Sequence, residues 1–141
     1  MATELRFTIS TAAPPARVFA AITEAAHLAH WFCDAAESEA EQGGRLRMRW
    51  NRSGAEQHPY EARWVAFEPR SKAAFRGGHA GYPHGDAGLI EFTLAADGPM
   101  TALHVRHAIP DGDEYIPVAK TFAEAWPRAL ERLAGYLTPN T

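Results

Sequence analysis

The sequence predicts an α+β protein in which a curved antiparallel sheet wraps around one long C-terminal helix. One reason is that stretches of alternating apolar and polar residues follow one another with tight turns between them, as antiparallel strands do. A second reason is TFAEAWPRALERLAGYL, residues 121–137, which carries one continuous apolar stripe. A curved sheet must cover its apolar face, and this helix is the only predicted element long enough to do so.

The first predicted elements are a strand and two short helices. Apolar and polar residues alternate over residues 4–11, which predicts a half-buried strand. Pro14 and Pro15 then open a helical stretch, because proline is tolerated in a first helical turn. PPARVFAAIT, residues 14–23, and EAAHLAHWF, residues 24–32, each group their apolar residues on one face. We therefore expect two consecutive short helices arranged as a V.

A run of about six antiparallel strands is expected to follow. An acidic loop at residues 37–42, a turn at 51–57 and a glycine-rich loop at 77–88 separate the alternating segments. Five of these strands are delimited by the pattern, at residues 45–50, 60–67, 72–76, 88–96 and 101–107.

Pro127 lies inside the last helical stretch, where a proline costs about 3 kcal/mol because it cannot donate to the carbonyl of Ala123. The apolar stripe nevertheless keeps its phase across this position, as two independent helices would not. We therefore predict one kinked helix that ends near Thr138. The stripe consists of Phe122, Trp126, Leu130, Leu133 and Leu137, and the opposite face of Lys120, Glu124, Arg128 and Glu131.

Composition limits the classes of protein. With 141 residues, 46% hydrophobic and 22% charged, the chain predicts one domain spanning residues 1–141. A formal net charge of -3 gives no reason to expect a nucleic-acid partner. No apolar run approaches the length of a membrane span, no signal peptide is visible, and the single cysteine excludes an internal disulfide framework. We expect a cytoplasmic protein without a membrane span.

The ordered set of segments resembles a known superfamily. PPARVFAAITEAAHLAHWF, then GGRLRMRW, FEP, TALHVRH and AWPRALERLAGYL resemble the START-like (Bet v 1-like, SRPBCC) proteins over nearly the whole chain. Within them, the chain is similar to the branch named for the C-terminal domain of the activator of the 90-kDa heat-shock-protein ATPase. The resemblance implies the helix-grip fold. That branch often has glycine where this chain has Ala62 and Ala125, and both alanines fill space near the cavity that the fold implies.

The resemblance also implies a cavity between the sheet and the long helix. An apolar cavity with a few polar atoms suits a small molecule, although the same side chains would form an ordinary core if they filled the space. The expected ligand-binding residues, from strand alternation, the second short helix and the helical stripe, are Trp31, Leu46, Met48, Trp50, Tyr60, Trp64, Phe92, Leu103, Val105, His107, Phe122 and Trp126.

Three functions follow as hypotheses. The first is binding of a small hydrophobic or aromatic molecule in this cavity, with no metal and no organic cofactor. The second is a cyclase- or hydrolase-type enzyme in which His107 is the catalytic general base and Tyr60 helps to hold the substrate; a hydrogen-bonded core histidine is the structural alternative. The third is a chaperone-interaction domain, as the branch name suggests. A homodimer is also left open.

Other groupings of reactive residues are weaker. Cys33 and His30 could form a nucleophile pair, but no third group orients them, so a buried structural thiol is the simpler reading. Arg45, Arg47 and Arg49 alternate along the strand at residues 45–50. They are best explained by cross-strand pairing with Glu61 and Glu91 on a solvated surface, with a partner surface as the alternative. Four residues around the glycine-rich loop have a zinc-like composition without a known ligand spacing: His58, His79, His84 and Asp86.

Overall fold

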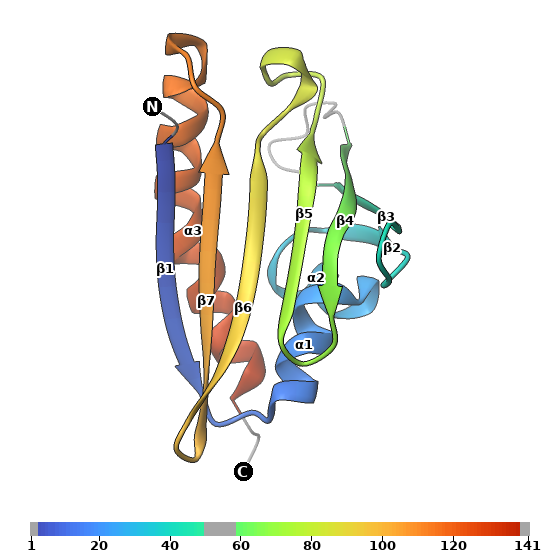
Figure 1. The fold of residues 1–141 in the computed structure, drawn as a ribbon, viewed down its shortest axis with the longest axis vertical. Helices are drawn as coiled ribbons and strands as arrows, with labels where there is room; N and C mark the ends of the chain where they lie inside the picture. The colour runs from blue at the N-terminus through green and yellow to red at the C-terminus, as the bar shows by residue number, and fades with distance from the viewer. Residues whose placement is uncertain (1–2, 50–58, 139–141) are drawn as a thin grey trace.

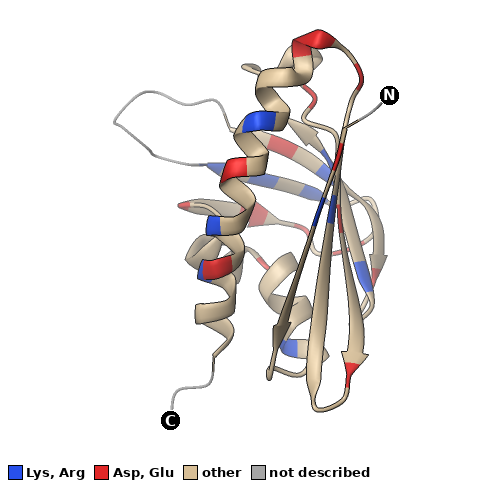
Figure 2. Ribbon diagram, turned by 90° about the vertical axis from the view of Figure 1, so that its left-hand side faces the viewer, with Lys and Arg blue, Asp and Glu red and all other residues tan. Residues whose placement is uncertain are grey.

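Seven antiparallel strands form one curved sheet, and three helices lie on the same side of it (Figures 1 and 2). The computed structural model describes residues 3–49 and 59–138. Its elements are β1 (Thr3–Thr11), α1 (Pro15–Thr23), α2 (Ala25–Trp31), β2 (Ala35–Ser38), β3 (Arg45–Arg49), β4 (Tyr60–Glu68), β5 (Lys72–Gly78), β6 (Leu89–Asp97), β7 (Met100–Ile109) and α3 (Ile116–Leu137). The predicted helix-grip architecture is therefore confirmed.

The strands lie in the order β1-β7-β6-β5-β4-β3-β2, and every neighbouring pair is antiparallel. Strands β2 to β7 follow the chain order, but β1 joins the sheet beside β7, with Thr3 opposite Ile109. The N-terminal strand therefore forms one edge of the sheet and β2 forms the other. Between these edges, the apolar rows of the strands face the helices.

The prediction of a loop at residues 37–42 is wrong for its first two residues, because Ala35–Ser38 forms β2. This strand contains only alanine, glutamate and serine, which are not strong strand formers. Its pairing comes from β3, where Ala36 lies opposite Met48. Trp50 and the turn expected at 51–57 lie outside the described residues.

The glycine-rich loop is shorter than expected, because Gly77 and Gly78 continue strand β5. A Cβ atom at Gly77 would collide with the carbonyl oxygen of Glu61 on β4. Glycine at this position therefore lets the two strands approach closely, and it acts as a strand residue. The remainder of the loop contains a single 3-10 turn at Pro83–Gly85.

Helix α3 is continuous from Ile116 to Leu137 with Pro127 inside it, as the unbroken stripe predicts. The opposite face of α3 is exposed to solvent. The buried residues of the stripe are Trp126, Leu130, Leu133 and Leu137, while Phe122 is half-buried. Within the described parts of the chain, no helix combines the length and the apolar character needed to cross a membrane.

The two short helices are tied to their surroundings through buried hydrogen bonds. Trp31 at the end of α2 donates its indole N–H to the carbonyl of Ala21 in α1 at 2.8 Å. The carbonyl of Trp31 accepts a hydrogen bond from the Arg132 side chain of α3 at 2.9 Å. These bonds fix Trp31 between the three helices and thus position one side of the interior that faces the sheet.

Candidate functional site

The side chains expected to line a cavity all point into the space between the sheet and the helices, where described. None of these buried residues is more than 2% exposed: Trp31, Leu46, Met48, Tyr60, Trp64, Phe92, Leu103, Val105, His107 and Trp126. Phe122 is half-buried, and Trp50 lies outside the described residues. Strand alternation and the helical stripe therefore predicted correctly which side chains face inward.

Trp126 lies at the centre of the interior and contacts aromatic rings from three other elements. Its ring stacks on Phe32 at a centroid distance of 5.4 Å, and Phe92 of β6 meets it edge-on at 6.1 Å. Phe7 of β1 lies 6.5 Å away, and Phe32 also stacks with Trp31 at 4.8 Å. In this conformation aromatic rings pack closely around Trp126.

A second set of rings continues the interior toward β4 and β5. Phe75 of β5 meets Trp64 edge-on at 5.5 Å and Tyr60 at 6.0 Å. Tyr82, from the loop after β5, contacts Tyr60 at 6.4 Å and Phe122 of α3 at 5.9 Å. Burial raises the pKa of Tyr82 to about 12 and that of Tyr60 well above its ordinary range, so both phenols stay neutral.

His107 is fully buried and both of its ring nitrogens are hydrogen-bonded. The carbonyl oxygen of Ala87 can only accept and lies 2.6 Å from Nε2, so Nε2 carries the proton. The indole N–H of Trp126 can only donate, and it donates to Nδ1 at 3.1 Å. Burial lowers the pKa of His107 to about 4. The imidazole is therefore a neutral ring of defined tautomer at neutral pH.

This geometry does not favour His107 as a general base. A base needs a free lone pair, and the one on Nδ1 is occupied by the Trp126 indole. The lowered pKa also makes the ring a weak proton acceptor. The arrangement is that of a hydrogen-bonded core histidine, the structural alternative to a catalytic one.

The loop between β5 and β6 is anchored from several sides. The N–H of Ala87 donates to the carbonyl of Gly77 at 2.7 Å, while the Ala87 carbonyl accepts from His107. Gly88 has a φ of 93°, and a Cβ atom there would collide with the carbonyl oxygen of Ala108. The hydroxyl of Tyr115, which precedes α3, donates to the carbonyl of Pro83 at 2.9 Å. This loop thus covers His107 and connects it to the start of α3.

The zinc-like grouping does not converge in the described residues. The ring of His79 stacks on Tyr82 at 3.8 Å, and His84 lies 3.5 Å from the carboxylate of Glu114. Asp86 accepts a hydrogen bond from Arg76 at 2.8 Å. Residues 3–49 and 59–138 contain no group of three or more side chains that could hold a metal ion, and His58 lies outside them.

Cys33 is a buried thiol that donates to the carbonyl of Leu28 at 3.6 Å, while His30 stacks on Tyr136 instead. Burial raises the pKa of Cys33 to about 11 from 9.0. We expect the native protein at pH 8 to react with a disulfide reagent about a hundredfold more slowly than the urea-unfolded chain, because the thiolate fraction falls by that factor. Stopped-flow absorbance measures both rates, and equal rates would contradict the assignment.

Several interior residues were not singled out from the sequence. Phe75 lies in a short strand, where the pattern KAAFR was too brief to assign an inward face. Tyr82 lies in a loop, where no period applies, and Phe32 was grouped with the apolar face of its helix but not placed in the cavity. Phe7 was assigned to the apolar face of its strand but not to the cavity, because its contact with Trp126 depends on β1 lying at the sheet edge.

Two surface hollows lie outside this interior. One, of about 770 Å³, lies on the outer face of strands β3 and β4 and is lined by alternating arginines and glutamates. The other, of about 580 Å³, lies between Pro14 and the C-terminal end of α3 and includes Arg17 and Tyr136. The guanidinium of Arg17 lies 5.7 Å from the Tyr136 ring centre, and His27 forms a 2.6 Å hydrogen bond with the Tyr136 hydroxyl.

Solved structures share this fold over nearly the entire chain. A Chromobacterium violaceum protein is 25% identical, with a TM-score of 0.75 over 97% of this chain and 98% of its own. The Aha1 dimer from Colwellia psychrerythraea is 18% identical, with a TM-score of 0.79 over 96% of both chains. CalU16 from Micromonospora echinospora is 20% identical, with a TM-score of 0.75 over 98% of this chain and 78% of its own.

The sequence comparison points the same way as the fold. No curated protein matches the chain in sequence. The family model described as "Activator of Hsp90 ATPase homolog 1-like protein" matches residues 12–138, from the turn before α1 to the end of α3. The chain therefore belongs to the activator of Hsp90 ATPase homolog 1-like family, within the START-like (SRPBCC) superfamily.

Proposed function

We propose that the protein binds a small hydrophobic or aromatic molecule between the sheet and α3. The interior is rich in aromatic rings, which give large apolar contact areas to a ligand. Its few polar groups are placed among these rings: the imidazole of His107, the indole N–H of Trp126 and the hydroxyl of Tyr60. Such a composition suits an aromatic ligand with one or two polar substituents.

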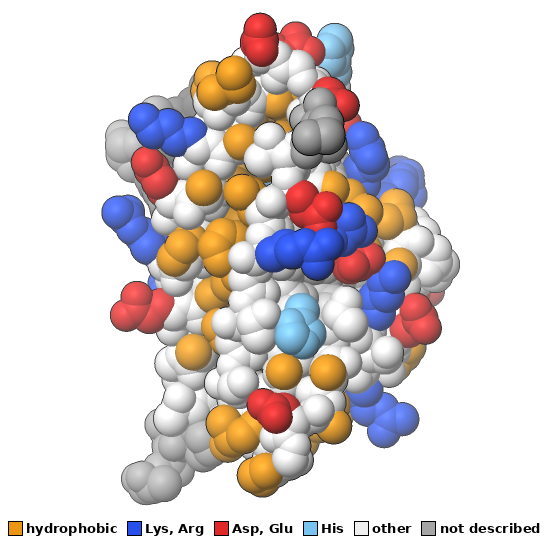
Figure 3. Space-filling view, turned by 60° about the vertical axis from the view of Figure 1, so that its left-hand side comes forward, with side chains coloured by type: hydrophobic (Ala, Val, Ile, Leu, Met, Phe, Trp, Pro, Cys, Tyr) orange, Lys and Arg blue, Asp and Glu red, His pale blue; other side chains and the backbone are white. Residues whose placement is uncertain are grey.

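The observation that carries the proposal is that the ring layer reaches the surface where β1 meets α3. Phe7 of β1 and Phe122 of α3 are only half-buried, yet Phe7 contacts Trp126 and Phe122 lies 4.5 Å from His107. Figure 3 shows a band of apolar side chains along this side of the molecule. Two half-buried rings, Phe7 and Phe122, therefore lie between solvent and the Trp126–His107 pair on this side.

Binding would proceed by displacement of these outer rings. Because rings fill the interior in the described conformation, an incoming ligand must take the place of at least one of them. Phe122 is the best candidate, since it is half-buried and its neighbours Tyr82 and His107 would regain contacts from a ligand ring. Each such aromatic contact contributes about 0.5–1.5 kcal/mol, so ligand contacts can offset those that are lost.

Truncation of Phe122 tests the proposal. We expect Phe122→Ala to bind 8-anilinonaphthalene-1-sulfonate several-fold more tightly than the unaltered protein, because the variant opens space above His107 and Trp126 without the need to displace a ring. Fluorescence titration measures the affinity, and near-UV circular dichroism verifies that native packing is retained. The matched control is Ile116→Ala, which removes a 63% exposed apolar side chain from the same helix.

An unchanged affinity in Phe122→Ala, or the same gain in Ile116→Ala, would contradict the proposal. A panel of aromatic acids and polycyclic compounds then competes with the bound probe to identify the ligand class. The homodimer and the chaperone partner stay predictions.

A further inference from the structure

The outer face of strands β2 to β5 carries two rows of charged side chains that run across the strands. In the first row, Glu37, Arg47 and Glu61 lie opposite one another on β2, β3 and β4. Charges alternate in this row, and Arg47 lies 3.5 Å from the carboxylate of Glu61. Cross-strand pairs of opposite charge stabilise a sheet, so this row is explained by its own internal pairing.

The second row, which we call the arginine row, has a different character. Arg45 of β3 lies directly opposite Arg63 of β4, and Arg63 lies directly opposite Arg76 of β5. Like charges placed opposite each other destabilise an antiparallel pair. Three adjacent strands therefore present the same positive charge at one level of the sheet, an arrangement that a bound anion would stabilise.

The partners of the arginine row leave much of its charge unpaired. Arg63 donates to the carbonyl oxygen of Gly43 at 3.1 Å, and only Arg76 reaches a carboxylate, that of Asp86 at 2.8 Å. Glu39 lies nearby, but its carboxylate accepts from the backbone N–H of Arg45 at 2.9 Å. Within the described residues, neither Arg45 nor Arg63 forms an ion pair with a carboxylate.

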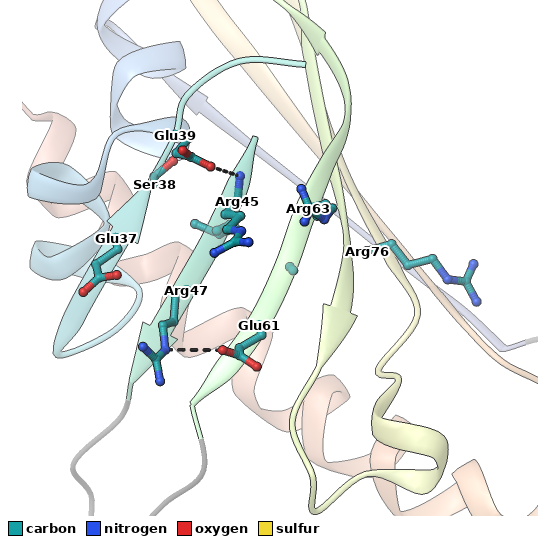
Figure 4. A pocket seen from close by; sticks show the side chains of 10 residues that line it. Glu37, Ser38, Glu39, Arg45, Arg47, Glu61, Arg63 and Arg76 are labelled. Carbon is teal, nitrogen blue, oxygen red and sulfur yellow. Dashed lines mark hydrogen bonds and ion pairs between the residues drawn. The ribbon is translucent and has the colours of Figure 1, made fainter. Parts of the chain in front are cut away.

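The arginine row forms one side of the hollow of about 770 Å³ on this face, which Glu37, Glu39, Arg47 and Glu61 also line. In Figure 4 the side chains of Arg45 and Arg63 lie next to each other on β3 and β4, whereas the side chain of Arg76 on β5 points away from them, and its guanidinium pairs with Asp86. Neighbouring strands are about 4.8 Å apart, so the three guanidinium groups are anchored over roughly 10 Å. The hollow therefore offers two neighbouring positive charges, those of Arg45 and Arg63, with a third anchored one strand further on.

We propose that the arginine row binds a polyphosphate group. Guanidinium groups bind phosphate oxygens through paired, charge-assisted hydrogen bonds and remain charged at every physiological pH. A phosphate between Arg45 and Arg63 offsets their mutual repulsion, and a further phosphate extends toward Arg76. A chain of two or three phosphates matches a row of this length better than a single phosphate does.

Isothermal titration calorimetry at low ionic strength with sodium tripolyphosphate tests the site. We expect the unaltered protein to bind tripolyphosphate more tightly than pyrophosphate, and pyrophosphate more tightly than inorganic phosphate. Arg63→Gln is expected to weaken tripolyphosphate binding at least tenfold. Arg128→Gln is the matched control because it makes the same change of charge at an exposed position of α3, and it should bind as the unaltered protein does.

Equal weakening in Arg63→Gln and Arg128→Gln would overturn the proposal, since the effect would then come from net charge alone. Absence of tripolyphosphate binding to the unaltered protein would overturn it as well. A titration with ATP distinguishes two sources of the same group. Equal affinity for ATP and tripolyphosphate assigns recognition to the phosphate chain, and tighter ATP binding adds a contribution from the nucleoside.

Thermal unfolding with and without tripolyphosphate supplies a second test, which distinguishes anion binding by Arg63 from a purely structural role of this residue. In the absence of anion, Arg63→Gln should unfold at the same or a higher temperature than the unaltered protein, because it removes the repulsion between neighbouring strands. Tripolyphosphate should raise the unfolding temperature of the unaltered protein but not that of Arg63→Gln. A variant that is destabilised without anion and still responds to tripolyphosphate would overturn the proposal.

Discussion

Trp126→Ala is expected to lower the free energy of unfolding by about 3–5 kcal/mol, the range for removing a large buried aromatic side chain. Trp126 is 1% exposed and contacts Phe7, Phe32 and Phe92 from three separate elements. Its removal leaves a cavity that these neighbours cannot fill without moving the sheet or α2. Urea unfolding followed by circular dichroism gives the loss, provided that the slope of the transition is unchanged.

Trp126→Phe separates packing from hydrogen bonding. Phenylalanine keeps most of the ring contacts but cannot donate to Nδ1 of His107, which is then left buried without its donor. An unsatisfied buried polar atom costs about 1–3 kcal/mol, so Trp126→Phe should lie between the unaltered protein and Trp126→Ala. A loss below about 1 kcal/mol for Trp126→Ala would show that the ring is not central to the core.

Protonation of His107 alone is expected to lower the free energy of unfolding by about 3 kcal/mol as the pH drops from above 6.5 to about 4. In the unfolded chain His107 takes up a proton near its ordinary pKa of 6.5, whereas burial lowers the pKa in the folded protein to about 4. Between these values the unfolded state binds more protons, so acid favours unfolding. The difference between the two pKa values sets the size of the effect, at 1.36 kcal/mol for each unit of pH.

Replacement of His107 by glutamine tests this assignment, because glutamine can form similar hydrogen bonds but does not titrate. Urea unfolding at several pH values between 4 and 7.5 should show a shallower pH dependence for His107→Gln than for the unaltered protein. His104→Gln is the control, since His104 is exposed on the outer face of the same strand. An identical dependence in His107→Gln and the unaltered protein would exclude His107 as its source.

The parts of the fold that were predicted from the sequence are those in which one local period decides the structure. The stripe through Trp126 and Leu130 can be recognised without reference to the sheet. It correctly predicted a continuous helix despite the local cost of Pro127. Alternation in β3 and β7 likewise identified Leu46 and His107 as inward-facing. In each case the apolar residues repeat often enough that the free energy of burying them decides the local structure, even where a single residue is unfavourable.

The parts that were missed depend on partners far away in the chain. Strand β2 forms because β3 offers it a hydrogen-bonding edge. The amino-acid composition of β2 by itself does not predict a strand. The role of His107 depends on Ala87 and Trp126, which lie in a loop and in another element. The filling of the interior depends on rings such as Tyr82 that follow no period. Whether a row of inward side chains encloses a cavity or a core is set by these distant contacts.

The position of β1 at the sheet edge has a consequence for the order of synthesis. β1 is synthesised before every other strand, but its neighbour in the sheet is β7. It can pair only after β7 has been synthesised, when Thr3 comes to lie opposite Ile109 and Thr11 opposite Thr101. Ribosomes add about 5–20 residues per second, so the wait is several seconds. During this time the apolar side chains of Leu5, Phe7 and Ile9 have no partner strand beside them. The N-terminal segment must therefore avoid pairing with other strands until nearly the whole domain has emerged.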